Sequence, residues 1–110
     1  MQLEFYRDGE GEARVRRKGR GRAVAGFLES DLQESAAAAQ EVLRALDEVE
    51  SGRRASWERT GNSHTLTLSP EGATIQNEMA EDAKPAHLSL AALREAVAGW
   101  AAFIGEGPRT

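Results

Sequence analysis

The chain has 110 residues, of which 40% are hydrophobic and 29% are charged, and its formal net charge is −4. This length and composition predict one globular domain and argue against intrinsic disorder. The absence of cysteine excludes disulfides, thiolate nucleophiles and zinc sites built on sulfur. No apolar run approaches the roughly 18 to 20 residues that span a bilayer, and the acidic N-terminal sequence does not fit a signal peptide. We therefore expect a cytoplasmic protein that does not enter membranes.

Charge is distributed unevenly along the chain. Residues 1–22 carry seven basic and four acidic side chains, whereas residues 23–110 carry seven basic and fourteen acidic side chains. The larger part is therefore an anion, which repels a phosphate backbone and attracts basic proteins. The exception is the basic segment RVRRKGRGR at residues 14–22, which has six basic side chains in nine positions.

The first 28 residues predict β-structure. Residues 3–8 and 12–16 alternate apolar and polar side chains, which is the two-residue period of a half-buried strand, and the glycines between them suit a tight turn. These two runs predict a β-hairpin. Residues 23–28, AVAGFL, are expected to continue it as a third strand, with Gly26 at a bulge or a close backbone approach.

A helix is predicted from residue 30 or 31 to about Glu50. Ser30 and Asp31 each stand three residues before a Gln or Glu, which is the spacing of a capping box, and Gly52 supplies a stop. Apolar residues recur every three or four positions and predict one buried stripe. This stripe comprises Leu32, Ala36, Ala39, Leu43, Leu46 and Val49.

The second half of the chain predicts three strands and a second helix. The two-residue period returns at Ser56, and residues 64–78 read as a hairpin around the turn sequence SPEG. The charged residues 79–87 are expected to form a linker. Ser89 is placed to cap a helix that ends at Gly105. The predicted inner face of this helix comprises Leu90, Leu93, Val97, Trp100, Ala101 and Ile104.

The predicted order ββ(β)αβββα indicates an α+β fold. We expect one antiparallel sheet of about five or six strands, built from hairpins, with two α-helices packed on one face. The domain is predicted to cover residues 1–105, followed by a C-terminal tail at residues 106–110.

The sequence does not predict an enzyme or a metal site. It contains no nucleophile elbow, no phosphate-binding loop and no cysteine, and Ser63 and His64 are adjacent in a predicted strand, so they point to opposite faces. His64 and His87 are 23 residues apart and lack metal-ligand spacing. The sequence DGEGE at residues 8–12 fits a hairpin turn better than a calcium loop. We therefore expect no catalytic residue, no metal and no cofactor.

An acidic cluster is the first candidate site. Its predicted function is to dock a basic protein partner, with Trp57 or Tyr6 as an aromatic anchor if either is exposed. The alternative interpretation is a solvated loop, with Trp57 in the core. The cluster comprises Glu71, Glu78, Glu81 and Asp82.

The basic segment is the second candidate site and would bind nucleic acid through its charges. No aromatic side chain interleaves the basic ones, so the segment lacks groups that stack on bases. The alternative interpretation is a solvated strand and loop, paired locally with acidic side chains. The basic residues are Arg14, Arg16, Arg17, Lys18, Arg20 and Arg22.

Four stretches together resemble the YacL-like family of small, uncharacterised bacterial cytoplasmic proteins. They are EFYRD (4–8), GRAVAGFLESD (21–31), LDEVE (46–50) and SWERTGNSHTLTLSPEG (56–72). The resemblance implies no established activity, cofactor or catalytic residue. The sequence departs from the family pattern in its arginine-rich residues 14–22 and in a short, less acidic tail.

Two functions from different classes follow from these features. The first is a non-enzymatic protein-binding module, most concretely an immunity protein that binds and neutralises a basic bacterial toxin domain, such as a nuclease delivered by a neighbouring cell. The alternative is a nucleic-acid or ribonucleoprotein accessory protein that uses the basic segment. A monomer and a homodimer are both compatible with either function.

Overall fold

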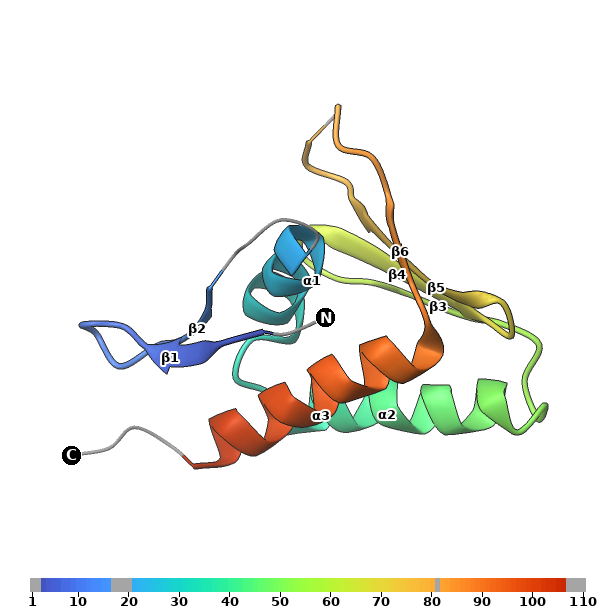
Figure 1. The fold of residues 1–110 in the computed structure, drawn as a ribbon, viewed down its shortest axis with the longest axis horizontal. Coiled ribbons are helices and arrows are strands. Elements are labelled where there is room, and N and C mark those ends of the chain that lie inside the picture. The colour runs from blue at the N-terminus through green and yellow to red at the C-terminus, as the bar shows by residue number, and fades with distance from the viewer. Residues whose placement is uncertain (1–2, 17–20, 81, 107–110) are drawn as a thin grey trace.

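The computed structural model describes residues 3–16, 21–80 and 82–106 (Figure 1). Its elements in chain order are β1 (Phe5–Arg7), β2 (Ala13–Val15), α1 (Arg22–Phe27), the π-helix η2 (Leu28–Leu32), α2 (Ala36–Glu50), β3 (Trp57–Thr60), β4 (His64–Ser69), β5 (Gly72–Asn77), β6 (Ala86–Leu88) and α3 (Leu90–Gly105). Of the predicted tail, only Glu106 lies within the described residues. Within this part of the chain, no helix has both the length and the apolar composition needed to cross a bilayer.

The predicted α+β class is confirmed, but the strands form two sheets rather than one. β1 and β2 form a two-stranded antiparallel hairpin, as predicted for residues 3–16. β3, β4, β5 and β6 form a four-stranded antiparallel sheet in which each strand pairs with the next. The predicted hairpin at residues 64–78 is confirmed, with a tight turn between Ser69 and Gly72. α2 and α3 lie on one side of the four-stranded sheet (Figure 1).

One face of the four-stranded sheet belongs to the core, because buried and partly buried side chains alternate along its central strands β4 and β5. In β4 the side chains of His64, Leu66 and Leu68 are buried, and the side chains between them are only partly buried. Leu66 pairs with Ile75 of β5 and Leu68 pairs with Ala73, so the buried side chains of both strands share one face. The period of two therefore assigns the opposite face to solvent.

Residues 23–28 are helical, so the predicted third strand is wrong. They lie in α1 and at the start of η2. Buried side chains follow one another in this segment instead of alternating, and a short apolar run of this kind does not distinguish a buried strand from a buried helix. The predicted close approach at Gly26 is confirmed, because a Cβ there would lie 3.2 Å from Nε2 of His64. The buried hydrophobic residues are Val24, Ala25, Phe27 and Leu28.

The long helix α2 is capped by Ser35, so the predicted start at residue 30 or 31 is wrong. The Ser35 hydroxyl accepts the N–H of Ala38 at 3.1 Å. The alternative cap, Asp31, binds His64 with its carboxylate instead and belongs to η2. The face of α2 that packs on the core differs from the predicted stripe, because Val42 and Ala45 are buried whereas Ala36 is exposed and Leu43 is only partly buried. The buried residues are Ala39, Val42, Ala45, Leu46 and Val49.

The segment predicted as a linker contains a strand. The last two residues of the predicted linker, 86 and 87, belong to β6, which ends at Leu88. This strand pairs Ala86 with Ile75 and Leu88 with Ala73. This strand has three residues, which is too short for a periodic pattern to reveal. The following helix α3 is confirmed, including its cap, since the Ser89 hydroxyl accepts the N–H of Ala92 at 3.0 Å. Its buried residues are Leu93, Ala96, Val97 and Trp100.

Two glutamates, Glu29 of η2 and Glu34 just after it, bind backbone N–H groups of strand β2. The backbone N–H of Val15 donates to Glu29 at 2.6 Å, and the N–H of Ala13 donates to Glu34 at 3.1 Å. Arg7 of β1 binds Glu34 at 2.6 Å. The outer edge of β2 has no neighbouring strand among the described residues, and its backbone N–H groups need acceptors. The two carboxylates supply them.

The chain leaves η2 through a strained residue, Gln33. Its φ is 53° and its ψ is −145°, a region that side chains disfavour, and among the described residues it is the non-glycine residue with positive φ. The Gln33 carbonyl accepts the indole N–H of Trp100 at 2.7 Å. This bond, from a buried side chain of α3, helps to hold the strained conformation.

We expect the Gln33→Gly variant to be more stable than Gln33→Ala by about 1 kcal/mol, because glycine relieves the strain in the folded state at some cost in chain entropy. Both variants lose the side-chain hydrogen bond to the Ser30 carbonyl, so their difference isolates the backbone term. Urea unfolding monitored by circular dichroism measures it. Equal unfolding free energies would show that the turn stores no strain.

We expect part of the stability to be lost on acidification through Glu34. The hydrogen bond from Arg7, and then that from the Ala13 N–H, lowers the pKa of Glu34 below its ordinary value of 4.5. A carboxylate with a depressed pKa stabilises the fold above the unfolded-state pKa, and this contribution disappears as the pH falls through the folded-state pKa. Urea unfolding should therefore show wild type more stable than Glu34→Gln at neutral pH, with the difference shrinking below about pH 4.5. A constant difference across this range would contradict the linkage.

Candidate functional site

The outward side of the four-stranded sheet is a polar surface, which we call the open face. Its residues are Glu58 and Thr60 of β3, Thr65 and Thr67 of β4, Thr74 and Gln76 of β5, and His87 of β6. Two hydroxyl contacts tie neighbouring strands together, Thr60 to Thr65 at 3.1 Å and Thr74 to the His87 ring at 3.2 Å. α2 and α3 lie on the opposite side (Figure 1), so the open face is available to a partner.

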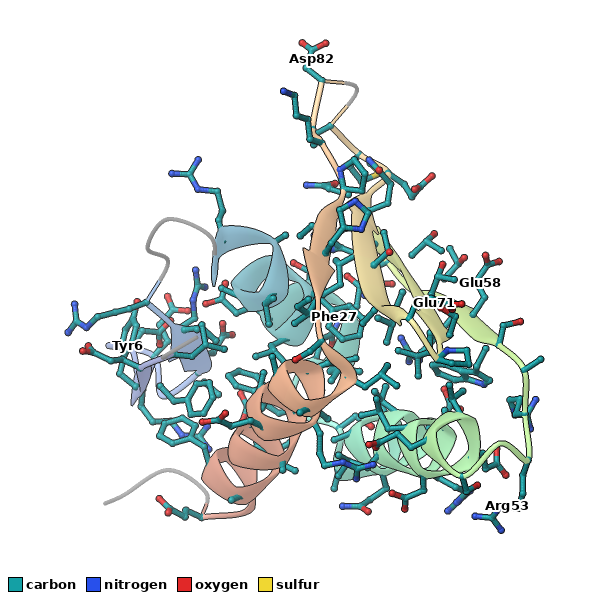
Figure 2. All side chains as sticks on the ribbon, turned by 45° about the vertical axis from the view of Figure 1, so that its right-hand side comes forward. Tyr6, Phe27, Arg53, Glu58, Glu71 and Asp82 are labelled. Atoms are coloured by element: carbon teal, nitrogen blue, oxygen red, sulfur yellow. The ribbon has the colours of Figure 1, made fainter. Side chains whose placement is uncertain are left out.

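The predicted acidic cluster does not form one patch. Glu71 lies in the turn between β4 and β5, whereas Glu78 follows the other end of β5 and Asp82 lies further out in the β5–β6 loop (Figure 2). β5 has six residues, and such a strand is about 20 Å long. Glu81 lies outside the described residues. The acids therefore flank the open face at two ends.

Glu58 joins Glu71 at one end of the open face and was missed by the sequence interpretation. It pairs with Thr67, two positions before Ser69, which begins the turn that carries Glu71. The Ser69 hydroxyl bonds to the Glu71 carboxylate and lowers its pKa, which favours the charged form. Successive side chains of a strand point to opposite faces, so the sequence SWERT could have revealed this position. Trp57 packs on the core, and its neighbour Glu58 therefore points outward.

The acids of α2 pair with arginines, whereas, among the described residues, those around the open face do not. The ion pairs of α2 and its neighbours are Glu41–Arg59, Glu48–Arg54, Asp47–Arg94 and Glu50–Arg94. Within the described part of the chain, no ion pair involves Glu58, Glu71, Glu78 or Asp82. Their charge is therefore free to attract a cation from outside.

Two described members of the basic segment, Arg14 of β2 and Arg16 just after it, pair with acidic side chains. Arg14 pairs with Glu29 at 3.3 Å, and Arg16 pairs with Glu4 at 2.9 Å. Arg16 also stacks over the ring of Tyr6, 5.3 Å from its centroid. These contacts match the interpretation of local pairing on a solvated strand.

The remaining basic residues have two different placements. Arg22 is exposed at the first position of α1. Three others lie outside the described residues: Arg17, Lys18 and Arg20. The structure therefore brings Arg14 and Arg16 together on the hairpin and separates Arg22 from them by a segment it does not describe.

A buried Asp31–His64 pair joins η2 to the start of β4. One Asp31 oxygen lies 2.9 Å from Nδ1 of His64, and the other accepts the His64 backbone N–H at 2.9 Å. Both side chains are almost fully buried. The sequence interpretation missed this pair, because the two residues are 33 positions apart and Asp31 also fits a helix cap.

The surroundings of this pair favour a structural role over catalysis. Nε2 of His64 faces Gly26 of α1, where even a Cβ would stand only 3.2 Å away, so there is no space for a substrate at that nitrogen. Gly61 covers Asp31 so closely that a Cβ there would overlap its carboxylate. In the described residues, no group of three or more His, Cys, Asp or Glu side chains is arranged to hold a metal ion.

Fold and surface together define a small α+β protein whose four-stranded sheet has one helix-covered face and one open polar face. The chain matches the uncharacterised protein family UPF0231 over residues 1–103, and it belongs to that family. The predicted resemblance to the YacL-like family is thereby confirmed, since the two are the same family. Comparison with curated proteins and with solved structures gave no match.

We expect Gly61→Ala to destabilise the fold by about 2 kcal/mol, because the added methyl group pushes against the Asp31 carboxylate. Gly9→Ala is a matched control, since a Cβ at Gly9 meets no atom within 4 Å, and it should change stability by less than about 0.5 kcal/mol. Urea unfolding measures both.

A double-mutant cycle with Asp31→Ala assigns the cause. The Gly61→Ala substitution should cost little in the Asp31→Ala background, because the clashing carboxylate is gone. Additive costs would contradict the proposed contact.

Proposed function

We propose that this protein is a non-enzymatic module that binds a basic protein through its open face, and most concretely that it is an immunity protein for a basic toxin domain. The observation that carries the proposal is the distribution of unpaired charge. Glu58, Glu71, Glu78 and Asp82 flank the open face without ion pairs among the described residues, whereas acids on α2 pair with arginines.

The chemistry of the open face suits a polar protein interface. Threonine hydroxyls can donate and accept hydrogen bonds, and strand pairing fixes their positions, so little side-chain freedom is lost on binding. Unpaired acids at the rim raise the association rate with a basic partner and disfavour acidic ones. A standard interface covers about 800 Å² on each partner, which is enough to reach both ends of a sheet face about 20 Å long.

The nucleic-acid alternative has less support from the described residues. Arg14 and Arg16 already bind Glu29 and Glu4, so binding a phosphate would require replacing these contacts. The acids of the open face would repel a phosphate backbone approaching that side. The protein-binding function therefore accounts for more of the surface.

Charge reversal on a tagged protein tests the proposal. The test variant carries Glu58→Lys, Glu71→Lys, Glu78→Lys and Asp82→Lys, and the matched control carries Glu10→Lys, Glu12→Lys, Glu95→Lys and Glu106→Lys, which changes the net charge equally. We expect wild type and control to capture one stoichiometric basic protein from nuclease-treated lysate of the native bacterium at low salt. The test variant should bind that protein, once purified, at least about tenfold more weakly, because several charge pairs are lost.

Two results would contradict the proposal. Equal affinity of the two quadruple variants would show that the open face is not the binding surface, and capture of nucleic acid alone would favour the alternative function. The immunity assignment has its own readout: the captured protein should be toxic when expressed alone, and co-expression with this chain should relieve the toxicity.

A further inference from the structure

The loop between β5 and β6 projects away from the body of the protein. Figure 1 shows it extending beyond the sheet, and Figure 2 places Asp82 near its tip. We call residues 78–80 and 82–85 the arm. The arm continues the open face outward at the end that carries Glu78.

Hydrogen bonds hold the base of the arm in one shape. The Gln76 side-chain amide donates to the Ala83 carbonyl at 3.1 Å, across the two sides of the loop. The N–H of Glu78 donates to the Ser63 carbonyl at 2.7 Å, and the N–H of Met79 donates to the Asn77 side chain at 2.9 Å. The base of the arm is already held in place, so it loses little entropy when it binds.

Met79 is the most exposed large hydrophobic side chain among the described residues. It is 76% exposed, and Tyr6, the other exposed one, is 39% exposed and lies under Arg16. A methionine side chain is unbranched, flexible and polarisable, so it adapts to an irregular apolar pocket. Its immediate neighbour Glu78 and the nearby Asp82 carry charges without ion pairs in the described part of the chain, and the arm also carries one cation, Lys84.

We propose that Met79 is an apolar anchor that inserts into a pocket on the basic protein partner, while Glu78 and Asp82 pair with cationic side chains around that pocket. This inference rests on the proposed function and adds the shape and chemistry of the partner: an apolar pocket with a basic rim. A buried apolar side chain surrounded by polar contacts is the usual arrangement of a binding hot spot. A membrane is the wrong occupant, because the two acids would be repelled by anionic lipids.

Site-specific photocrosslinking in the native bacterium tests the proposal. The photoreactive residue p-benzoylphenylalanine is placed on the full chain at position 84 of the arm, at position 67 of the open face, or at position 102 on the exposed side of α3. We expect one basic protein to be crosslinked from positions 84 and 67 and nothing from position 102. In the position 84 background, Met79→Gln should lower the yield about tenfold, whereas Met79→Leu, which stays apolar, should retain it.

The outcomes separate the anchor from the proposed function. A crosslink from position 67 but not from 84, or equal yields for Met79→Gln and Met79→Leu, overturns the anchor and leaves the open face as the binding surface. No crosslink from either position overturns both proposals. A crosslink to a second copy of this chain overturns the anchor as an element for a basic partner. Thermal unfolding checks that the two Met79 variants fold as the wild type does.

Discussion

The rest of the structure depends on the contact between the Asp31 carboxylate and His64. The carboxylate sits in the interior, accepts the backbone N–H of His64 and lies 2.9 Å from the ring nitrogen Nδ1 of the same residue, so it fixes the point where the four-stranded sheet meets the helical segment before α2. Gly61 and Gly26 approach this pair without side chains, which leaves room for it. A buried carboxylate is tolerated because hydrogen-bond donors surround it, and removing either partner would leave a polar group without compensation.

The π-helix that carries Asp31 also holds the other parts of the fold. Glu29 accepts an N–H of the hairpin, and just beyond the π-helix the Gln33 carbonyl accepts the indole N–H of Trp100. A π-helix pairs each N–H with a carbonyl five residues earlier, so its side chains are spaced differently from those of a regular α-helix. The strain at Gln33 is thus offset by bonds to three separate elements. Local irregularity here is the means by which the hairpin, the sheet and α3 are joined.

This organisation explains why one sheet face is left open. The helices and the hairpin gather on the side where His64, Leu66 and Leu68 are buried, so the threonine-rich side receives none of them. Arginines pair with the acids of α2, which leaves unpaired negative charge around the open face and on the arm. This unpaired negative charge beside the open face supports the proposed docking of a basic partner.

The sequence by itself determined the class of the fold, both hairpins, the capped terminal helix and the family, because these depend on local periodicity, turn residues and caps. Only the tertiary structure decided that residues 23–28 are helical, since a segment covered on all sides has no periodic pattern to reveal its type. It also decided that Asp31 binds His64 rather than capping a helix, because that choice depends on residues 33 positions away. The acids near one another in sequence were separated for the same reason: a six-residue strand places Glu71 and Glu78 at opposite ends of a face that only folding creates.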